Sequence, residues 1–454
     1  MSSLPSINVS SLLSAMGSSS QGIDVASTVA QLISVQRAPE RQWMQDQNDL
    51  QTQADALTKI NTLTSGITQT LNDLKDPLGA LSSVIATSSQ DSIVGVSAGA
   101  GAIAGDHTVV VSNLALTGSW YSDVVANADA ALTPGTFDLQ IGSNPATTIT
   151  VGSGVNTLNG LVSYINGQNL GVRASVVTDA NGARLALVSN TSGAAGDITI
   201  SNTSGLAFTR AVEGKNASLT IDGIPITSAS NTVAGAVDGV TFQLKTAAPG
   251  TPVNIKVSPD VDKISKSIQS FVNGYNSVIK EINSQFTYNT STQTAGPLAG
   301  DSGLRILQTN LLSAGSYSSS GDTIATLRSV GVSMNNDGTL TLDSTQLTQA
   351  LQGNFNAVRT FFHGTAGDGF AGYLSAQLEP LVDSTEGAFT VELKSISATK
   401  DSLQDQIDRF EVYIAGEQTR LSDVYNKANI MLQQMPYRQQ QIDALLGNFG
   451  GSKK

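Results

Sequence analysis

The chain has 454 residues, of which 40% are hydrophobic, 13% are charged and none is cysteine, and its formal net charge is −12. This length is enough for about three domains, and the lack of cysteine excludes disulfides, thiolate catalysis and cysteine-based metal sites. The negative charge argues against nucleic acid as a partner, because binding phosphates requires clustered Lys and Arg. With only two histidines, histidine-based zinc or general-base chemistry has few candidates. We therefore expect no cofactor, no metal and no catalytic residues.

The N-terminus is rich in serine and carries no Lys or Arg before Arg37. A cleaved secretory signal needs a basic start and a solid apolar core, and both are missing. No apolar run reaches the roughly 18 residues of a transmembrane helix, so no membrane association is expected. The protein is either cytosolic or exported by a route that reads an uncleaved, flexible start.

Two helices are expected from residue 24 to 75. Asp24 can cap the first, which ends near Arg37 because Pro39 disfavours helix at the residue before it. The second has a heptad spacing and stops at Asp76 and Pro77. Its apolar positions are Trp43, Leu50, Leu57, Ile60, Ile67, Leu71 and Leu74.

From about residue 79 to 262 the apolar period changes to two, which predicts strands. The clearest strands are expected at 108–111, 136–141, 147–151, 174–177, 185–188 and 198–200. They are separated by turn signals such as Asp222-Gly223. One helix is expected within this region, at 157–166. No lysine occurs from 76 to 214, so few surface ion pairs are available there.

From about residue 263 the helical period returns. A β-hairpin is predicted at 330–342 around Asn336, Asp337 and Gly338. The chain then ends in one long heptad register, where we expect a kink or a break at Pro436. The apolar positions of this register are Leu403, Ile407, Phe410, Ile414, Leu421, Val424, Ala428, Met431, Met435, Ile442, Leu445 and Phe449. Exposing so many apolar side chains to water is unfavourable, so we expect them to be buried against the N-terminal helix, a sister subunit or another partner. Helical ends around a β-rich middle suggest that the termini pair and the middle projects.

Four motifs suggest chemistry but have simpler interpretations. Ser97 lies in a G-x-S-x-G pattern, yet the residues after it are a poor helix start, unlike a hydrolase nucleophile elbow. The G-x-G-x-x-A pattern from Gly99 also lacks the helix that a dinucleotide site needs. The oxygen-rich run at 335–338 is typical of a hairpin turn more than of a calcium loop, since Ser344 stands where the bidentate Glu would be. Neither His107 nor His363 has a clustered acid or a second ligand, so both are interpreted as ordinary residues.

Several blocks of the chain resemble one family in the expected order. The segments GIDVASTVAQLI (22–33) and RAP (37–39) resemble the N-terminal signature of flagellar filament capping proteins, also called hook-associated protein 2. The segments TLNGLVSYIN (157–166), GVRASVV (171–177) and GARLAL (182–187) are similar to the flagellin hook IN repeat. Further blocks similar to the family are LTIDGIPIT (219–227), GVTF (239–242), GTPV (250–253), FVNGYN (271–276) and AGPLAGD (295–301).

The resemblance implies a structural protein, not an enzyme. Such proteins form a homo-oligomeric ring, expected here to have five subunits, at the distal tip of the bacterial filament. Outer β domains form a plate that retains exported flagellin, and helical legs open assembly sites. The implied partners are further copies of this chain, flagellin, the hook–filament junction proteins and an export chaperone near the C-terminus. Export by the flagellar type III route and a location at the filament tip are also implied.

The implied fold is a multidomain α+β protein, with a coiled-coil-like helical leg built from both termini and inserted antiparallel β-rich head domains. The expected units are a flexible N-terminal segment (1–40), a leg helix (41–78), an inner β domain (79–106 with 215–262), an outer β domain (107–214), a helical domain with a hairpin (263–386) and a C-terminal leg (387–454). Heptad packing does not determine the number of subunits in a ring.

Site residues are expected from the seams and the resemblance. The leg seam is expected to comprise Leu50, Leu57, Ile60, Leu71, Leu74, Leu403, Ile407, Phe410, Ile414, Leu421 and Val424. Subunit contacts are expected at Ile264, Ile268, Phe271, Tyr275 and Ile279. Three alternatives remain: another axial protein such as a flagellin or junction protein, an adhesin that uses the β head, and a hydrolase at Ser97.

Overall fold

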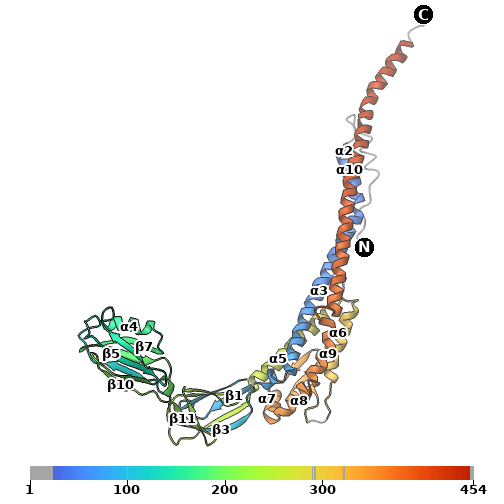
Figure 1. Ribbon diagram of the computed structural model, residues 1–454. Helices are drawn as coiled ribbons and strands as arrows, with labels where there is room; N and C mark the ends of the chain where they lie inside the picture. Colours follow the sequence, from blue (N-terminus) through green and yellow to red (C-terminus); the bar gives the residue numbers. More distant parts are fainter. Residues whose placement is uncertain (1–23, 100, 289, 291–292, 321–322, 450–454) are drawn as a thin grey trace.

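A computed structural model describes residues 24–449 except 100, 289, 291–292 and 321–322. The part of the predicted N-terminal segment before Asp24 lies outside these residues. The molecule is elongated, with two β units at one end, a helical domain in the middle and a long leg of paired helices at the other end (Figure 1). The predicted fold class, a helical leg with antiparallel β-rich heads, is therefore confirmed.

Helices from both ends of the chain build the leg. Helix α2 (Val25–Gln36) begins at Asp24, whose side chain accepts a hydrogen bond from the Ser27 N–H at 3.1 Å, as an N-cap should. Helix α3 (Ala38–Lys75) begins after Arg37, with Pro39 in its first turn, where the missing N–H costs nothing. Helix α10 (Ala388–Phe449) runs back along both.

Helix α10 contains 62 residues and continues through Pro436. A kink or a break was predicted at this proline, and the helix has no break there. The proline removes one backbone hydrogen bond, and the helix continues on both sides of it.

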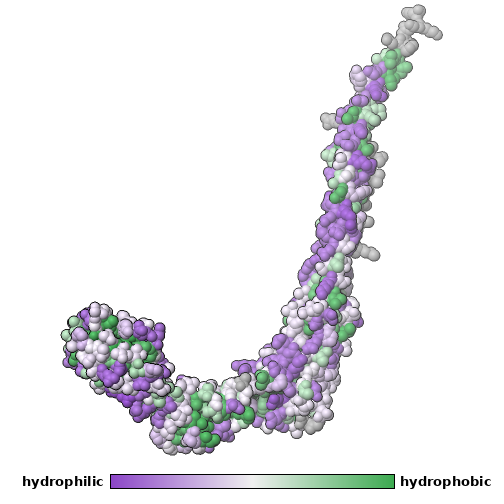
Figure 2. Space-filling view, in the orientation of Figure 1, coloured by the Kyte–Doolittle hydropathy of each residue, from purple (hydrophilic) through white to green (hydrophobic). Residues whose placement is uncertain are grey.

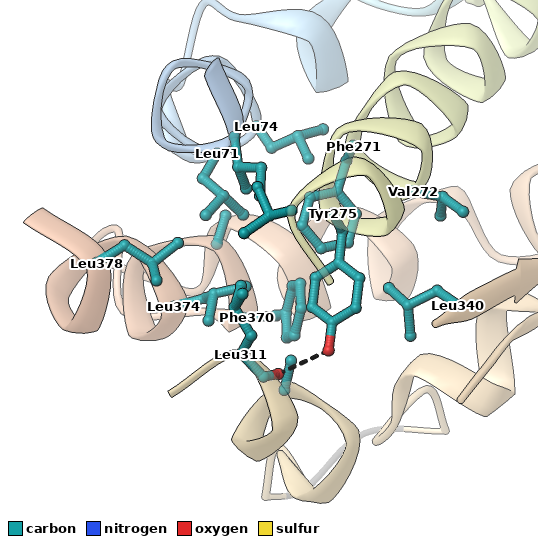
Figure 3. Packing of buried hydrophobic residues seen from close by; sticks show 14 of the residues in the cluster. Leu71, Leu74, Phe271, Val272, Tyr275, Leu311, Leu340, Phe370, Leu374 and Leu378 are labelled. Atoms are coloured by element: carbon teal, nitrogen blue, oxygen red, sulfur yellow. Dashed lines mark hydrogen bonds between the residues drawn. The ribbon is translucent and has the colours of Figure 1, made fainter. Parts of the chain in front are cut away.

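The helical domain surrounds helix α5 (Val261–Phe286). Around it lie α6 (Ser302–Ser313), α7 (Ser344–Gly353), α8 (Phe355–His363), α9 (Phe370–Val382), the short helices η1 (Ala80–Ser82), η3 (Ala314–Ser316) and η4 (Leu327–Val330), and the hairpin β16 (Val332–Met334) with β17 (Leu340–Leu342). The second half of α3 packs on α5 and α9, so this domain contains residues from widely separated parts of the chain. Tyr275 lies at the centre, and its hydroxyl donates a hydrogen bond to the Leu311 carbonyl at 2.9 Å (Figure 3). Burial raises the pKa of Tyr275, so the phenol stays protonated.

The inner β unit is built from two antiparallel sheets that share one core. The first sheet has the order β1-β15-β3-β11-β12 and the second has the order β13-β14-β2. The strands are β1 (Val84–Ser88), β2 (Val94–Ala98), β3 (Gly105–Asn113), β11 (Ala217–Ile221), β12 (Ile224–Ser228), β13 (Thr232–Val237), β14 (Val240–Leu244) and β15 (Val253–Pro259).

The outer β unit is inserted between β3 and β11 and has its own core. Its sheets have the orders β10-β4-β8-β7 and β6-β5-β9. Helix α4 (Leu158–Gly167) packs on β7 and contributes Leu158, Leu161 and Ile165 to the core. The strands are β4 (Ser119–Ser122), β5 (Gly135–Ile141), β6 (Thr147–Val151), β7 (Val172–Asp179), β8 (Gly182–Ser189), β9 (Ile198–Ser201) and β10 (Phe208–Val212), and η2 (Ala194–Gly196) precedes β9.

Candidate functional site

The leg is held together by a small apolar cluster between α2 and α10. Val29, Ile33 and Ile414 are buried in it, and Val25, Phe410, Leu421 and Tyr425 cover its sides. Trp43 of α3 meets Phe410 edge to face, with ring centroids 5.4 Å apart, a favoured aromatic geometry. Two helices of opposite direction are thus joined along one stripe, as the heptad spacing requires.

The predicted leg seam divides between two environments. Leu57, Ile60, Leu71 and Leu74 are fully buried in the core of the helical domain, and the half-buried Leu50 packs on its border. Along α10, Ile407 and Ile414 are buried, while Leu403, Phe410 and Leu421 are half-buried. Val424 is 50% exposed. The residues toward the C-terminal end of the seam therefore have the least cover.

The residues predicted as subunit contacts lie inside the helical domain. Ile264, Ile268, Phe271, Tyr275 and Ile279 are each at most 1% exposed. Their apolar spacing reflects the face that α5 turns toward its own core, so they are not available for a neighbouring subunit in this arrangement.

Arg37 joins the two halves of the leg through ion pairs that were not predicted from the sequence. Its guanidinium donates to both carboxylate oxygens of Glu40, at 2.9 and 2.8 Å, and in a two-pronged pair to Glu411, at 2.8 and 2.9 Å. The Glu411 hydrogen bond is the main reason that the pKa of Arg37 is raised, and the same contact lowers the pKa of Glu411. Glu40 is three residues from Arg37, so their ion pair could have been predicted from helical spacing. Glu411, 374 positions away, could not.

Arg37→Gln is expected to weaken the joint between α2, α3 and α10. Glu40 is only 5% exposed and would lose its cation. A buried polar group that is left unsatisfied costs about 1–3 kcal/mol, and a charged one costs more; we expect about 1–2 kcal/mol here because Arg37 itself is one-third exposed and screened by solvent. Thermal unfolding followed by Trp43 emission measures the effect. The control is Arg41→Gln, since Arg41 is exposed and bonds the Ser34 carbonyl; an equal loss in both variants would contradict the special role of Arg37.

Polar contacts continue the joint below Arg37. The Gln47 amide donates to the Lys400 carbonyl and to the Gln404 side chain, both at 3.2 Å. Lys400 in turn hydrogen-bonds to Gln51. Side-chain amides and the Lys400 ammonium group thus join α3 to α10.

Toward its C-terminal end, α10 carries exposed apolar side chains. They gather toward the far end of the helix in Figure 2. The exposed set is Val424, Ile430, Met431, Leu432, Met435, Tyr437, Ile442, Leu445 and Leu446. We call this stretch the leg end. Patches of this kind mark surfaces that bind other molecules.

His107 has an acidic partner, contrary to the prediction. Its Nδ1 lies 2.8 Å from Asp222 Oδ2, and the other Asp222 oxygen accepts the Thr108 N–H at 2.8 Å. Asp222 occupies the left-handed region at the β11–β12 turn, with φ of 51°, which brings it back over β3. Because the two residues are 115 positions apart in the sequence, the pair could not be predicted from local spacing. The His107 contact is the main reason that the pKa of Asp222 is lowered.

Asp222→Asn is expected to make the inner β unit less sensitive to acid. Because folding lowers the pKa of Asp222, the carboxylate stabilises the fold above its ordinary pKa of about 4, and this contribution is lost as the pH falls through the folded value. The effect should stay below about 1 kcal/mol, since the side chain is half-exposed. Urea unfolding at pH 7 and pH 3 measures it, with Asp238→Asn in the β13–β14 turn as control. An unchanged pH dependence in Asp222→Asn would contradict it.

The remaining motifs are ordinary structure. Ser97 lies within β2, opposite Thr241 of β14, so it does not occupy the strand-to-helix turn of a nucleophile elbow. Asn335 and Asp337 form the β16–β17 turn, and Asp337 bonds Thr339. Within the described ranges, no group of three or more His, Cys, Asp or Glu side chains could hold a metal ion. Among the helices described, none is long and apolar enough to cross a membrane.

Comparison with known proteins places these features in a family. Residues 21–117 match the model of the flagellar hook-associated protein 2 N-terminus, and residues 214–437 match that of its C-terminus. Residues 136–191 match the flagellin hook IN motif. Together the first two models cover most of the chain.

This chain is similar to individual members of the family over most of their length. The chain is 29% identical to the B-type flagellar hook-associated protein 2 of Pseudomonas aeruginosa, covering 81% of this chain and 84% of the relative. It is 27% identical to the Escherichia coli K12 flagellar hook-associated protein 2, covering 91% and 96%. The crystal structure of the D1-D2-D3 domains of the flagellar cap protein FliD from Escherichia coli superposes with a TM-score of 0.60 at 25% identity, covering 75% of this chain and 99% of that one.

Proposed function

The chain belongs to the flagellar hook-associated protein 2 family of flagellar cap proteins, and we propose from this premise that it caps the distal end of the bacterial flagellar filament. In this role it is exported, assembles into an oligomer on the filament, retains exported flagellin and promotes its insertion. The proposal makes it a structural protein without catalytic activity.

One observation carries the proposal: among the described residues, the exposed leg end lies at one extreme of the molecule and the two β units lie at the other (Figure 1). A cap has to bind the filament on one side and block the exit on the other. An exposed apolar helix suits the first task, because such a stripe is stabilised when it packs on another helix. Two β units with few charged side chains suit the second task. The described part of this region forms few ion pairs, so it has few charges that would bind exported flagellin tightly.

The finer features of the proposal come from the resemblance to the family. The ring is proposed to contain five subunits, the junction proteins are proposed to precede the cap at the growing end, and an export chaperone is proposed to cover the leg end before assembly. The three separate hydrophobic cores support the division into helical, inner and outer units. The leg seam is proposed to act through Ile407, Phe410 and Ile414.

Deletion of the gene tests the function. A cap mutant should release monomeric flagellin into the medium and bear no long filaments, whereas a flagellin mutant should release none. Electron microscopy of filament tips with an antibody to the outer β unit should find the protein there, and counting copies would give the ring size. Normal filaments in the deletion strain would overturn the proposal.

A further inference from the structure

Strand β7 is the last strand of the four-stranded sheet in the outer β unit. It forms a hairpin with β8 in which Asp179 lies opposite Gly182, across a two-residue turn. In such a hairpin the closing pair exchanges hydrogen bonds, and alternate residues do the same along the ladder. The odd-numbered residues of β7 therefore bond to β8. The backbone groups of Val172, Ala174, Val176 and Thr178 point away from it, along a strand edge.

The side chain of Asn166 occupies part of that edge. Its amide nitrogen donates to the Ala174 carbonyl at 3.0 Å, and its amide oxygen accepts the Ala174 N–H at 2.8 Å. One side chain thus satisfies both backbone groups of one residue, as a neighbouring strand would. Within the described ranges, Asn166 is the one side chain hydrogen-bonded to this edge.

The same device occurs at two other places in the chain. Asn276 makes both bonds to Leu340 of β17, at 2.7 and 2.6 Å. Asn231 makes both bonds to Ala115, at 2.7 and 3.0 Å. All three bonded residues are buried, but β7 is the terminal strand of its sheet, and its residues Ser175, Val177, Thr178 and Asp179 are exposed. Unpaired strand edges are templates for another strand, so the Asn166 contact has a consequence that the other two lack.

The edge of β7 is complementary to itself. In an antiparallel pairing of two copies centred on Val176, Arg173 of each copy lies opposite Asp179 of the other. These are the charged residues of β7, both are exposed, and their charges are opposite. Opposite charges across a strand pair stabilise it, and like charges destabilise it. Ala174 would lie opposite Thr178 of the second copy, and this is the pair whose hydrogen bonds Asn166 now takes.

We propose that the outer edge of β7 is a docking edge for β7 of a second copy of this chain, and that Asn166 keeps it closed. Pairing would join two four-stranded sheets into one, and the Asn166 side chain must leave Ala174 before it can occur. The contact therefore keeps the β units of separate copies apart.

Cross-linking of the full chain tests the proposal, because the sequence has no cysteine. Ser175 and Val177 are exposed and would lie opposite each other in two paired copies. Residues in such a non-hydrogen-bonded pair have Cα atoms about 4.5 Å apart, within disulfide range. We would mix chains carrying Ser175→Cys with chains carrying Val177→Cys and measure the disulfide-linked fraction under mild oxidation. Adding Asn166→Ala to both chains should raise that fraction at least ten-fold.

The matched control is Asn159→Ala, on the same helix, where the side chain bonds Asp129 and not the strand edge. A further Arg173→Asp should lower the linked fraction in the Asn166→Ala chains, and adding Asp179→Arg should restore it. Equal cross-linking in the Asn166→Ala and Asn159→Ala chains, or an unchanged yield with Arg173→Asp, would overturn the proposal.

Hydrogen exchange of β8 checks that the outer unit stays folded. If Asn166→Ala unfolds the outer β unit, Asn166→Asp replaces it, because aspartate keeps the acceptor for the Ala174 N–H and loses the donor to the Ala174 carbonyl. The Asn166→Asp chains should give an intermediate cross-linked fraction. A fraction equal to that of Asn159→Ala would contradict the proposed docking edge.

Discussion

Phe370→Ala is expected to lower the free energy of unfolding of the helical domain by about 3–5 kcal/mol, the usual cost of removing a fully buried phenylalanine. Phe370 begins α9, is fully buried and contacts four other aromatic rings. Its ring stacks on Phe361 at 5.7 Å and meets Phe271, Phe362 and Tyr317 at steep angles, with centroids 5.6 to 5.8 Å apart. These rings come from different segments of the chain, so their contacts with Phe370 hold the domain together.

Urea unfolding followed by far-ultraviolet circular dichroism measures this loss. Phe355→Ala is the matched control, because Phe355 is half-buried and packs on the border of the same core. It should cost clearly less. A Phe370→Ala domain as stable as that of Phe355→Ala would show that the surrounding rings close the cavity, and would contradict the central role of this side chain.

The double substitution Ile407→Asp with Phe410→Asp is expected to separate the leg and abolish filament growth while both β units stay folded. Ile407 is buried on the leg helix, and Phe410 covers both Trp43 and the apolar cluster of α2. Ile407→Asp loses about 1.5–3 kcal/mol of burial, Phe410→Asp loses less because Phe410 is half-buried, and both carboxylates add a desolvation cost. The described cores of the two β units contain neither residue, so they should be unaffected.

The measurement has two parts: hydrogen exchange of α2 and the β strands, and complementation of a deletion strain. The control is Val412→Asp with Tyr413→Asp on the same turn of α10, where the side chains are 76% and 58% exposed. The control should leave the leg paired. If the Ile407 and Phe410 variant supports normal filaments, the seam is not required for capping.

The sequence predicted the elements well because their signals are local. Apolar residues at heptad spacing located α3 and α10, and the cap at Asp24 with Pro39 located the joint between α2 and α3. The turn signals at Asp222-Gly223 and Asn336 to Gly338 fell between paired strands. Spacing and turn chemistry depend on neighbours a few residues away, so one sequence is enough to read them.

The partner of each apolar face could not be read in this way. Ile264 to Ile279 show the same period as a subunit interface would, yet they line an internal core. The period indicates that a face is buried and does not identify its partner. The ion pair of Arg37 with Glu411 and that of His107 with Asp222 join residues far apart in the chain, so only the fold reveals them. The sequence predicts a kink or a break at Pro436, and α10 continues through this residue without a break.

The unbroken helix α10 also has a mechanical consequence. Its 62 residues span about 93 Å at 1.5 Å per residue. A rotation of the helical domain by only about 3° would therefore carry the far end of this lever sideways by about 5 Å. A small tilt at the base is thereby magnified into a lateral displacement of about half the 8–10 Å that separates the axes of packed helices.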